Sequence, residues 1–465
     1  MRFDVVTIGG GLSGLVTACR AAQLGQRVAV LEQGSDERYL CSSRWSTGVV
    51  NVMGSSILSD PAQLERAILD GSGGTARPDL ARAVAQNGKR AIEWLSAQGC
   101  RFVQRQQKNQ LGHQVLAPPR RMQAGLDWEG RGADVLMRLL EAQIKERGGE
   151  VLRGTKAEAL IVTSGACRGV EAIRNGEHLR IDAKAVVIAD GGFPANRDMV
   201  AQYITPRADR VLCRAWSGAR GDGIRMVETA GAAIGGLGKF YGHIHHRNAM
   251  TNAQLWPYPH LDAAAEVAIL VGPDGKRFTD EGLGGVCMAN AIAQLVDPLS
   301  SHLILDDAIW QTEPKITVTV PANPAMPDAG GPLVTAADLA SLAEQIAVPA
   351  NALAATVAAY NDAVARGDFA GLPVSRRFRK HRPMPIAKAP FHAVPLCAGI
   401  TGTMGGVLID ANAQAQTPAG APFPGLYAVG TPVAGLEGGP RAGYVGGLSK
   451  AFVLGLLAAE HIAAH

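Results

Sequence analysis

The first thirty residues show a short apolar run, a helical stretch and a second short apolar run. The first run covers Phe3–Ile8, an Ala- and Leu-rich stretch follows to about Leu24, and the second run covers Arg27–Leu31. Short apolar runs next to glycine predict buried strands, and the spacing of apolar residues between them predicts a helix that ends at Gly25. The pattern therefore predicts a β-turn-α-β unit at the start of the chain.

Later apolar patterns predict further helices and strands. Helical periodicity returns at Ala62–Leu69, Leu80–Ala97 and Asp134–Arg147. Short β-like runs follow at Glu150–Leu152, Ala159–Thr163, Gly169–Arg174 and Glu177–Ile181. Asn175-Gly176, between the last two runs, is a typical two-residue hairpin turn. Another apolar run, Ala185–Ala189, leads directly into Asp190-Gly191-Gly192, so a second predicted strand ends in glycine.

The pattern changes in the middle of the chain. From about Ile234 to Met384 proline becomes frequent and the predicted helices are short. Strands next to glycine return from Ala389, and a helix from Ser449 to about Ala463 closes the chain. We expect an α/β domain formed by residues 1–233 and 385–465, with an inserted domain at residues 234–384.

The composition is that of a large folded protein with an excess of glycine. Glycine accounts for 56 of the 465 residues, or 12%, whereas an average chain has about 7%. The hydrophobic fraction of 47% excludes a disordered chain, and the lack of a G-X-Y period excludes collagen. Glycine lets backbone approach a ligand closely, so the excess suggests such approaches in this chain.

Charge gives no indication of nucleic-acid binding. The formal net charge is only +4, and the densest basic stretch, Arg376–Arg382, is interpreted as a solvated loop. Aromatic residues are not interleaved with Lys or Arg in the way that stacking on bases requires. We expect no nucleic-acid partner.

The spacing of the cysteines and the lengths of the apolar runs indicate in which cellular compartment the protein is found. No two of the seven cysteines lie within twenty residues of each other, which excludes CxxC redox pairs and zinc knuckles and favours a reducing compartment. The first residues lack the layout of a signal peptide, and the run Ala451–Ala459 is shorter than the roughly eighteen residues of a membrane span. We expect a cytoplasmic protein without membrane insertion.

The turn after the first predicted strand carries a dinucleotide-binding fingerprint. Gly9-x-Gly11-x-x-Gly14 opens the predicted helix, and Glu32 ends the next strand. The first glycine makes the tight turn, the second lets backbone meet a pyrophosphate, and the third lets helix and strand pack closely. The helix N-terminus favours phosphate, and the Glu32 carboxylate can accept from ribose hydroxyls. The predicted residues of this end are Gly9, Gly11, Ser13, Gly14, Glu32 and Gln33.

Seven segments spread over the chain resemble one known family. They are IGGGLSGL at 8–15, ADGGFPAN at 189–196, GDGIRMVETAGA at 221–232, GKRFTDE at 275–281, APFHAV at 389–394, TMGGVLID at 403–410 and PGLYAVG at 424–430. In this order they resemble the fumarate reductase and succinate dehydrogenase flavoproteins, including the soluble tricarballylate dehydrogenase and 3-ketosteroid dehydrogenase branches. The resemblance implies a Rossmann-like FAD-binding domain of the glutathione-reductase type with an inserted α+β capping domain. Glycine at three predicted strand ends, Gly9, Gly191 and Gly430, independently suits a long cofactor.

The resemblance also indicates how FAD is held. Membrane-bound members attach the flavin to a His after the second strand, and residues 42–48 contain no His, so we expect non-covalent FAD. In that loop Ser42, Ser43 and Thr47 could bind the cofactor or form a polar surface loop. The predicted cofactor residues beyond the fingerprint are Ser42, Ser43, Thr47, Gly48, Asp190, Gly191, Gly192, Gly430, Thr431, Gly446, Gly447 and Leu448.

Candidate catalytic residues follow from the same resemblance. Family members move a hydride between flavin N5 and a carbon beside a carboxylate or carbonyl, while an acid or base handles a proton. Arg441 corresponds to the family's C-terminal Arg, and either binds the substrate or bonds to structural carbonyls. His243 and His245 correspond to a substrate His of the capping domain. They could instead be exposed loop residues or a metal pair, but no third ligand supports a metal, and none is predicted.

Two departures from the family alter the expected chemistry. No His precedes Thr403-Met404-Gly405-Gly406, and no Arg follows Arg277-Phe278 before Arg366, so the usual proton donor is missing. Tyr241 and Tyr444 are the predicted alternatives, because a phenol next to cations can act as acid or base. Arg277 is predicted to be structural, pairing with Glu281, or to line a proton route.

The sequence therefore predicts an FAD-dependent dehydrogenase or reductase acting on a CH–CH group. We expect a small, tricarballylate-like carboxylate as substrate, because Arg441 and two or three histidines would supply cationic groups to bind it. A separate electron acceptor or donor is implied. A ketosteroid-type dehydrogenase, a flavoprotein subunit of a larger complex and a non-catalytic FAD module are the alternatives.

Overall fold

The N-terminal strand β1 (Arg2–Ile8) lies inside a parallel sheet whose carboxyl ends meet at one edge. It pairs in parallel with β2 (Val28–Glu32) and β10 (Glu177–Ile188), and β7 (Glu150–Arg153) and β18 (Pro422–Ala428) extend the sheet. The strand order is β17-β18-β10-β1-β2-β7, with β17 at Gln414–Gln416. The computed structural model describes residues 1–465 except 108–109, 122, 124, 313–319 and 378–380. The predicted β-turn-α-β unit is confirmed.

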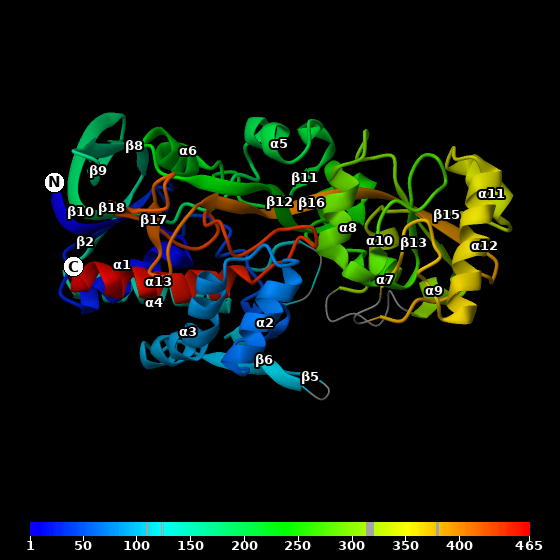
Figure 1. The fold of residues 1–465 in the computed structure, drawn as a ribbon, viewed down its shortest axis with the longest axis horizontal. Coiled ribbons are helices and arrows are strands. Elements are labelled where there is room, and N and C mark those ends of the chain that lie inside the picture. Colours follow the sequence, from blue (N-terminus) through cyan, green and yellow to red (C-terminus); the bar gives the residue numbers. More distant parts are fainter. Residues whose placement is uncertain (108–109, 122, 124, 313–319, 378–380) are drawn as a thin grey trace.

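Helices pack on this sheet in the half of the molecule that holds both termini (Figure 1). Helix α1 (Leu12–Gln23) packs against α4 (Gly132–Glu146) and against the C-terminal helix α13 (Gly447–Ala464), which also contacts α3 (Pro78–Ala97) (Figure 1). Helix α2 (Pro61–Gly71) packs on α3, and a smaller sheet has the order β4-β3-β6-β5. Its strands are Ser55–Ser56, Val49–Val52, Gln110–Leu116 and Phe102–Gln107.

The hairpin turn predicted at Asn175-Gly176 is confirmed, but the two strands predicted after it form one strand in the structure. Strands β8 (Thr155–Thr163) and β9 (Ala166–Arg174) form an antiparallel extension, and Asn175 and Gly176 both have positive φ in the turn to β10. The runs Glu177–Ile181 and Ala185–Ala189 fall on the single strand β10, except that β10 ends at Ile188, one residue before the predicted end. Its first half pairs antiparallel with β9 and its second half pairs parallel with β1, so no break is needed between them.

A second sheet is built around the long strand β16 (Phe391–Val407). Its partners are β12 (Ile234–His246), β14 (His302–Asp306), β15 (Val334–Ala336) and β11 (Leu212–Cys213), while β13 (Ile269–Val271) pairs with β14. Strands β12 and β16 run from the half with the termini into the other half (Figure 1). Their register shifts between Gly235 and Lys239 and again between Tyr241 and Gly242.

Helices of the second half surround this sheet, and the two halves have separate apolar cores. The helices are α5 (Arg197–Tyr203), α7 (Asp262–Val267), α8 (Gly285–Ala293), α9 (Asp307–Thr312), α10 (Ala322–Asp328), α11 (Leu339–Gln345) and α12 (Ala350–Arg366). Helix α6 (Asp222–Thr229) lies against β8 of the first half and also contacts β12 and β16 (Figure 1). One core joins β1, β2, β10 and α13, and the other joins β12, β13, β14 and β16 together with residues 193–224. The domain boundaries at 233/234 and 384/385 stay a prediction.

A buried carboxylate with two guanidiniums stabilises the second half. Arg277 Nη2 lies 2.5 Å and Arg376 Nη1 lies 3.2 Å from Glu281 Oε2, and all three side chains are buried. The predicted pairing of Arg277 with Glu281 is confirmed. The interpretation of Arg376–Arg382 as a solvated loop is wrong for Arg376, because Glu281 compensates its charge inside the protein. Residues 378–380 of that loop lie outside the described residues.

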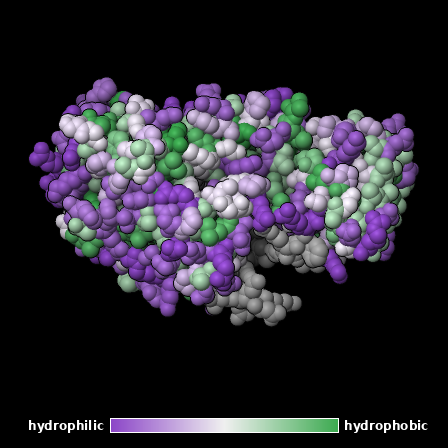
Figure 2. Space-filling model, in the orientation of Figure 1, coloured by the Kyte–Doolittle hydropathy of each residue, from purple (hydrophilic) through white to green (hydrophobic). Residues whose placement is uncertain are grey.

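Helix α13 combines length and low polarity. Among the described residues it is the one helix long and apolar enough to cross a membrane, with a mean hydropathy of 1.3. More than half of it is buried, by α1 and α3 among others, which is typical of a core helix. On the face of the molecule shown in Figure 2, hydrophobic residues are scattered among hydrophilic ones and do not form a continuous band.

Candidate functional site

A pocket opens where β1, β2 and β10 end. Parallel α/β sheets bind ligands at this edge. The predicted cofactor residues that line the pocket are Gly9, Gly11, Ser13, Glu32, Gln33, Ser42, Ser43, Asp190, Gly191, Gly192 and Thr431. The predicted cofactor residues outside its lining are Gly14, Thr47, Gly48, Gly430, Gly446, Gly447 and Leu448.

The glycine turn is shaped for close backbone contacts. Gly9 has φ +105°, and a Cβ at this position would lie 2.7 Å from the carbonyl oxygen of Ala189. A Cβ at Gly14 would lie only 2.1 Å from the carbonyl oxygen of Gly9, so this glycine lets α1 pack against the turn. Gly11, the N-cap of α1, has no capping side chain, and the Ser43 Oγ accepts from the Leu12 N–H at 3.0 Å. Helix α1 thus presents its N-terminus to the pocket.

Glu32 has contacts besides the one predicted from the sequence. Its Oε2 accepts from the Gly10 N–H at 2.9 Å and its Oε1 accepts from the Gly34 N–H at 2.7 Å, so the carboxylate also fixes the turn. Burial raises the pKa of Glu32, and the two backbone N–H groups oppose this effect. The contact of Glu32 with a ribose stays a prediction.

The predicted residues outside the pocket lining pack the surrounding backbone. A Cβ at Gly430 would lie 2.8 Å from Ser13 Oγ, and one at Gly446 would lie 2.2 Å from the carbonyl oxygen of Asn51. A Cβ at Gly48, which follows Thr47, would lie 3.2 Å from Leu116 Cβ. Gly447 donates its N–H to the Tyr444 hydroxyl at 2.7 Å at the start of α13, just before Leu448. Their contacts with a cofactor stay predictions.

Asp190 places a carboxyl group in the pocket. Its Oδ2 accepts from the Gly223 N–H at 2.7 Å, whereas Oδ1 is buried without a hydrogen-bond partner among the described residues. Burial raises the pKa of Asp190 to about 7, and the nearby carboxylates of Asp222 and Glu32 add to the effect. An unpartnered buried oxygen, a helix N-terminus and the glycine cradle fit a dinucleotide cofactor such as FAD.

The raised pKa of Asp190 predicts pH-dependent cofactor binding. A neutral carboxyl tolerates an anionic cofactor, so affinity is highest below pH about 7 and falls as Asp190 ionises above it. We expect a loss on the order of tenfold, or ~1.4 kcal/mol, between about pH 6 and about pH 8. Titration of FAD into the apoprotein, followed by flavin fluorescence, measures it. Asp190→Asn should bind FAD with little pH dependence, and an unchanged profile in this variant would contradict the assignment.

Tyr241, His243 and Asp262 form a hydrogen-bonded chain. Tyr241 and His243 lie on β12, and Asp262 begins α7. His243 Nδ1 lies 2.6 Å from Asp262 Oδ2, and His243 Nε2 lies 3.0 Å from the Tyr241 hydroxyl. The Ile244 N–H donates to Asp262 Oδ1 at 2.9 Å. Burial alone would raise the pKa of Asp262, but His243, His260 and the Ile244 N–H hold it below its usual value.

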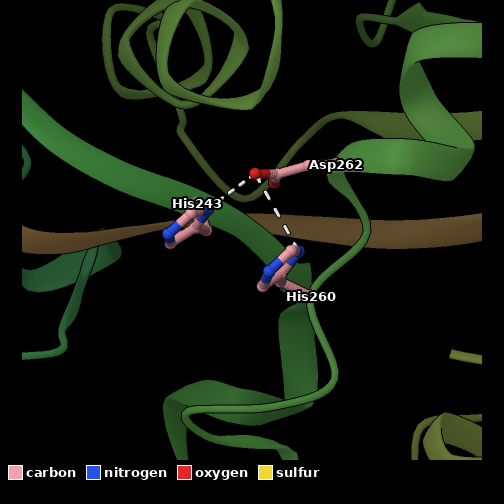
Figure 3. Close-up of side chains that lie close together, drawn as sticks. All are labelled: His243, His260 and Asp262. Atoms are coloured by element: carbon pink, nitrogen blue, oxygen red, sulfur yellow. Dashed lines mark hydrogen bonds and ion pairs between the residues drawn. The ribbon is translucent and has the colours of Figure 1, made fainter. Parts of the chain in front are cut away.

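His260 stacks on His243. The two rings are 4.5 Å apart and nearly parallel, at 7°, and Figure 3 shows both imidazoles approaching Asp262. Burial lowers the pKa of His260 to about 3, and the neighbouring His243 and Arg214 also act to lower it. The ligand atoms of His243, His260 and Asp262 lie within 4.8 Å of one another. Parallel rings do not aim their nitrogens at a common point as tetrahedral ligands do, and we interpret the cluster as a hydrogen-bonded group.

His245 does not share the surroundings of His243. It is completely buried, beside Gly399 and Arg214, and neither ring nitrogen has a hydrogen-bond partner in the described part of the chain. Burial, with Arg214 nearby, holds its pKa well below the usual value. His245 is therefore neutral, and its predicted contact with a substrate carboxylate stays untested.

Two of the predicted tyrosines lie together. The rings of Tyr241 and Tyr444 stack with centroids 3.7 Å apart. Burial raises the pKa of both phenols, so both are protonated at neutral pH. Glu437 bonds to the Val445 N–H at 2.9 Å and pairs with the buried Lys450 at 2.5 Å, which fixes the loop that carries Tyr444.

Arg441 lies elsewhere on this loop. Its Nη1 donates to the carbonyl oxygen of Asp70, near the end of α2, at 3.0 Å. No hydrogen bond or ion pair among the described residues joins it to Tyr241 or His243. The structure thus brings together Tyr241, His243 and Tyr444, whereas the described hydrogen bond of Arg441 is with the carbonyl oxygen of Asp70.

Sequence reasoning missed Arg214, His260 and Asp262. Arg214 Nη1 donates to Thr401 Oγ1 at 2.6 Å, and Thr401 lines the cofactor pocket. The proximity of His260 and Asp262 to the His cluster was a signal in the sequence. Arg214 had none, because the pairing of β11 with β16 places it beside Thr401.

Known proteins resemble the chain over its whole length. NADH:fumarate oxidoreductase from Klebsiella pneumoniae (strain 342) is 26% identical over 447 residues, covering 95% of this chain and 45% of that protein. Fumarate reductase (cytochrome) from Shewanella frigidimarina is 25% identical over 477 residues, covering 99% of this chain and 77% of that protein. The chain thus spans less than half of the first relative and about three quarters of the second.

Solved structures share the fold. A 3-ketosteroid delta1-dehydrogenase from Sterolibacterium denitrificans superposes with a TM-score of 0.77 at 21% identity, covering 100% of this chain and 99% of that one. A flavocytochrome c3 fumarate reductase in an open conformation gives 0.69 at 20% identity, covering 100% and 78%. The predicted fold class, an α/β FAD-binding flavoprotein fold, is confirmed.

The sequence model of the family described as FAD binding domain matches residues 4–443. This match covers most of the chain and bears out the predicted cofactor, FAD, while the mode of its attachment is not shown. Together with the shared fold, it confirms the resemblance to the fumarate reductase flavoproteins. The chain belongs to the FAD binding domain family.

Proposed function

We propose that the protein is an FAD-dependent oxidoreductase that acts on a CH–CH group next to a carboxylate or carbonyl. When bound, FAD supplies the two-electron chemistry of hydride transfer. The observation that carries the proposal is the Tyr241–His243–Asp262 chain beside the pocket. Tyr241 pairs in register with Gly402 of β16, and Gly402 lines the cofactor pocket.

The chain of three side chains can move one proton at the Tyr241 hydroxyl. Asp262 accepts from His243 Nδ1–H, which leaves His243 Nε2 as an acceptor for the Tyr241 O–H. During a dehydrogenation, His243 Nε2 takes the Tyr241 proton while the Tyr241 oxygen takes a proton from the substrate carbon, which leaves His243 protonated on both nitrogens beside Asp262. A reduction starts from this doubly protonated His243, whose Nε2–H returns a proton to Tyr241 as Tyr241 gives its own to the substrate carbon. The group takes the place of the Arg that the sequence lacks after Arg277-Phe278.

The names of the relatives bear on the electron donor or acceptor of this protein. Their names include NADH and a cytochrome as redox partners, which supports a separate electron donor or acceptor for this protein as well. We propose a cytoplasmic location and non-covalent FAD. The substrate-binding role of Arg441 remains part of the proposal, although its described contact is with Asp70.

The direct test uses the flavin spectrum of the purified protein. We expect flavin absorption bands, and we expect acid precipitation to release all FAD into the supernatant. Under anaerobic conditions, the reduced protein is mixed with acrylate, fumarate, 3-phenylacrylate (cinnamate) and a cyclic enone, and the oxidised protein with their saturated forms. Reoxidation or bleaching by at least one compound is the expected result. A protein that binds FAD but responds to none of these compounds contradicts the proposal.

A further inference from the structure

Arg120 and Arg214 are two buried guanidiniums without a carboxylate partner in the described part of the chain. Their exposed fractions are 7% and 9%. Arg120 donates to the carbonyl oxygens of Trp45 and Gly125, and Arg214 donates to Thr401 Oγ1 and to the carbonyl oxygen of Pro257. The Nε atom of each is buried and has no hydrogen-bond partner among the described residues.

The other buried arginines among the described residues do have carboxylate partners. Arg44 pairs with Asp134, and Arg277 and Arg376 share Glu281. Burying a cation without a counter-ion is unfavourable, and burial lowers the pKa of both Arg120 and Arg214. Arg214 donates to the carbonyl oxygen of Pro257, and the Arg120 guanidinium lies over the ring of the next residue, Tyr258, so both cations face the same segment. An anionic ligand would supply the missing negative charge.

Three tryptophans gather beside the two arginines. The Trp45 ring meets Trp216 at 6.0 Å and Trp256 at 5.8 Å, both edge to face. The chain has six tryptophans in all, so half of them lie here. The indole Nε1 atoms of Trp45 and Trp256 are buried donors without a hydrogen-bond partner in the described residues. Aromatic walls with unused donors suit a planar ring that carries an acceptor group.

This cluster borders both the cofactor pocket and the proton chain. Trp216 lines the pocket, and Arg214 holds Thr401, which also lines it. The Arg120 guanidinium lies 5.7 Å above the Tyr258 ring, and Tyr258 contacts His260, which stacks on His243. A ligand held here would lie next to both the cofactor pocket and the proton chain of Tyr241, His243 and Asp262.

We propose that Arg120, Arg214 and the three tryptophans bind a ring-bearing carboxylate, whose anion meets the guanidiniums and whose ring meets the indoles. The proposal rests on the proposed function and names the substrate class of the same site. It differs from the small tricarballylate-like acid expected from the sequence. Arg441 and the histidines suggested that acid, whereas the site proposed here also uses Trp45 and Trp216, which come from outside residues 234–384.

The test compares ligands that differ in one property. Cinnamate has the ring and the charge, acrylate lacks the ring, and cinnamamide lacks the charge. Binding to the anaerobic holoenzyme, followed by tryptophan fluorescence and by the flavin spectrum, should be at least about tenfold tighter for cinnamate than for either of the others. If acrylate or cinnamamide binds as tightly as cinnamate, the inference is overturned.

Single substitutions test the arginines and the tryptophans of the site separately. Arg214→Met and Arg120→Met should each abolish the preference for cinnamate over cinnamamide, whereas Trp256→Leu should abolish the preference over acrylate. Arg82→Met, at an exposed arginine that pairs with Glu65, is the control and should keep both preferences. Flavin content reports whether each variant is folded. A folded Arg214→Met and a folded Arg120→Met that both keep the charge preference would overturn the inference.

The outcomes distinguish this inference from the proposed function. If acrylate or fumarate reoxidises the flavin and cinnamate shows no binding advantage, the function holds and the ring-binding site is wrong. If cinnamate binds with the expected preferences and none of the unsaturated or saturated compounds changes the flavin, the site holds and the function is wrong.

Discussion

Replacing Tyr241 by Phe is expected to lower kcat by about 10²- to 10⁴-fold, the usual contribution of a positioned acid or base. The variant keeps the ring that stacks on Tyr444 at 3.7 Å, so the surrounding packing is retained. It removes only the hydroxyl that bonds to His243 Nε2. FAD content and substrate binding should therefore change little, while the proton step is lost.

Stopped-flow measurement of flavin reoxidation by a saturating substrate gives the rate of this step directly. Tyr427→Phe is the matched control, because the Tyr427 hydroxyl also bonds to an imidazole, that of His461, at 2.9 Å, but between β18 and α13. The control should keep the wild-type rate. A Tyr241→Phe enzyme as fast as the control would show that the proton comes from another group.

Gly14→Ala is expected to remove FAD from the purified protein, with an affinity loss of at least about 100-fold, or ~2.7 kcal/mol. A Cβ at this position would lie 2.1 Å from the Gly9 carbonyl oxygen and 3.3 Å from the Ala189 side chain. The nearest obstacle is backbone, which cannot rotate away as a side chain can. Helix α1 must therefore move off the turn, and the turn loses the shape that the cofactor needs.

Flavin absorbance per mole of protein, together with a titration of added FAD, measures this loss. Gly371→Ala is the control, because a Cβ there meets no atom within 4 Å and Gly371 has no strained φ. The control should bind FAD as the wild type does. A Gly14→Ala protein that retains one FAD per chain would mean that α1 can shift without disturbing the turn.

The cofactor could be predicted from a pattern within one short stretch of the sequence. Gly9, Gly11 and Gly14 lie within six residues, and the fold that they require forms from adjacent elements, so the sequence pattern alone could locate them. The prediction of two strands in place of β10 was wrong, because the course of this strand depends on contacts with distant segments. Its continuity depends on two different neighbours, β9 and β1, and polar residues in the middle of the strand hide it.

The substrate side of the site depends on contacts between distant segments. Trp45, Arg120, Arg214 and Trp256 come from four separate stretches, and their proximity follows from strand pairing around β16 and from loops packed on it. No spacing in the sequence records such proximity. Family resemblance pointed to Arg441, whose guanidinium bonds to the end of α2, and to His243. Tyr241 was predicted because the usual proton donor of the family is missing, and the structure places its hydroxyl 3.0 Å from His243 Nε2.

Strands β12 and β16 run through both halves of the molecule, and β12 also carries Tyr241 and His243 of the proton chain. Any movement of one half against the other must therefore bend the strand that holds this pair. The register of β12 against β16 already shifts between Gly235 and Lys239 and again between Tyr241 and Gly242, and the second shift begins at Tyr241 itself. A bend at this shift would change the 3.0 Å distance between the Tyr241 hydroxyl and His243 Nε2, so the geometry of proton transfer depends on how the two halves are placed.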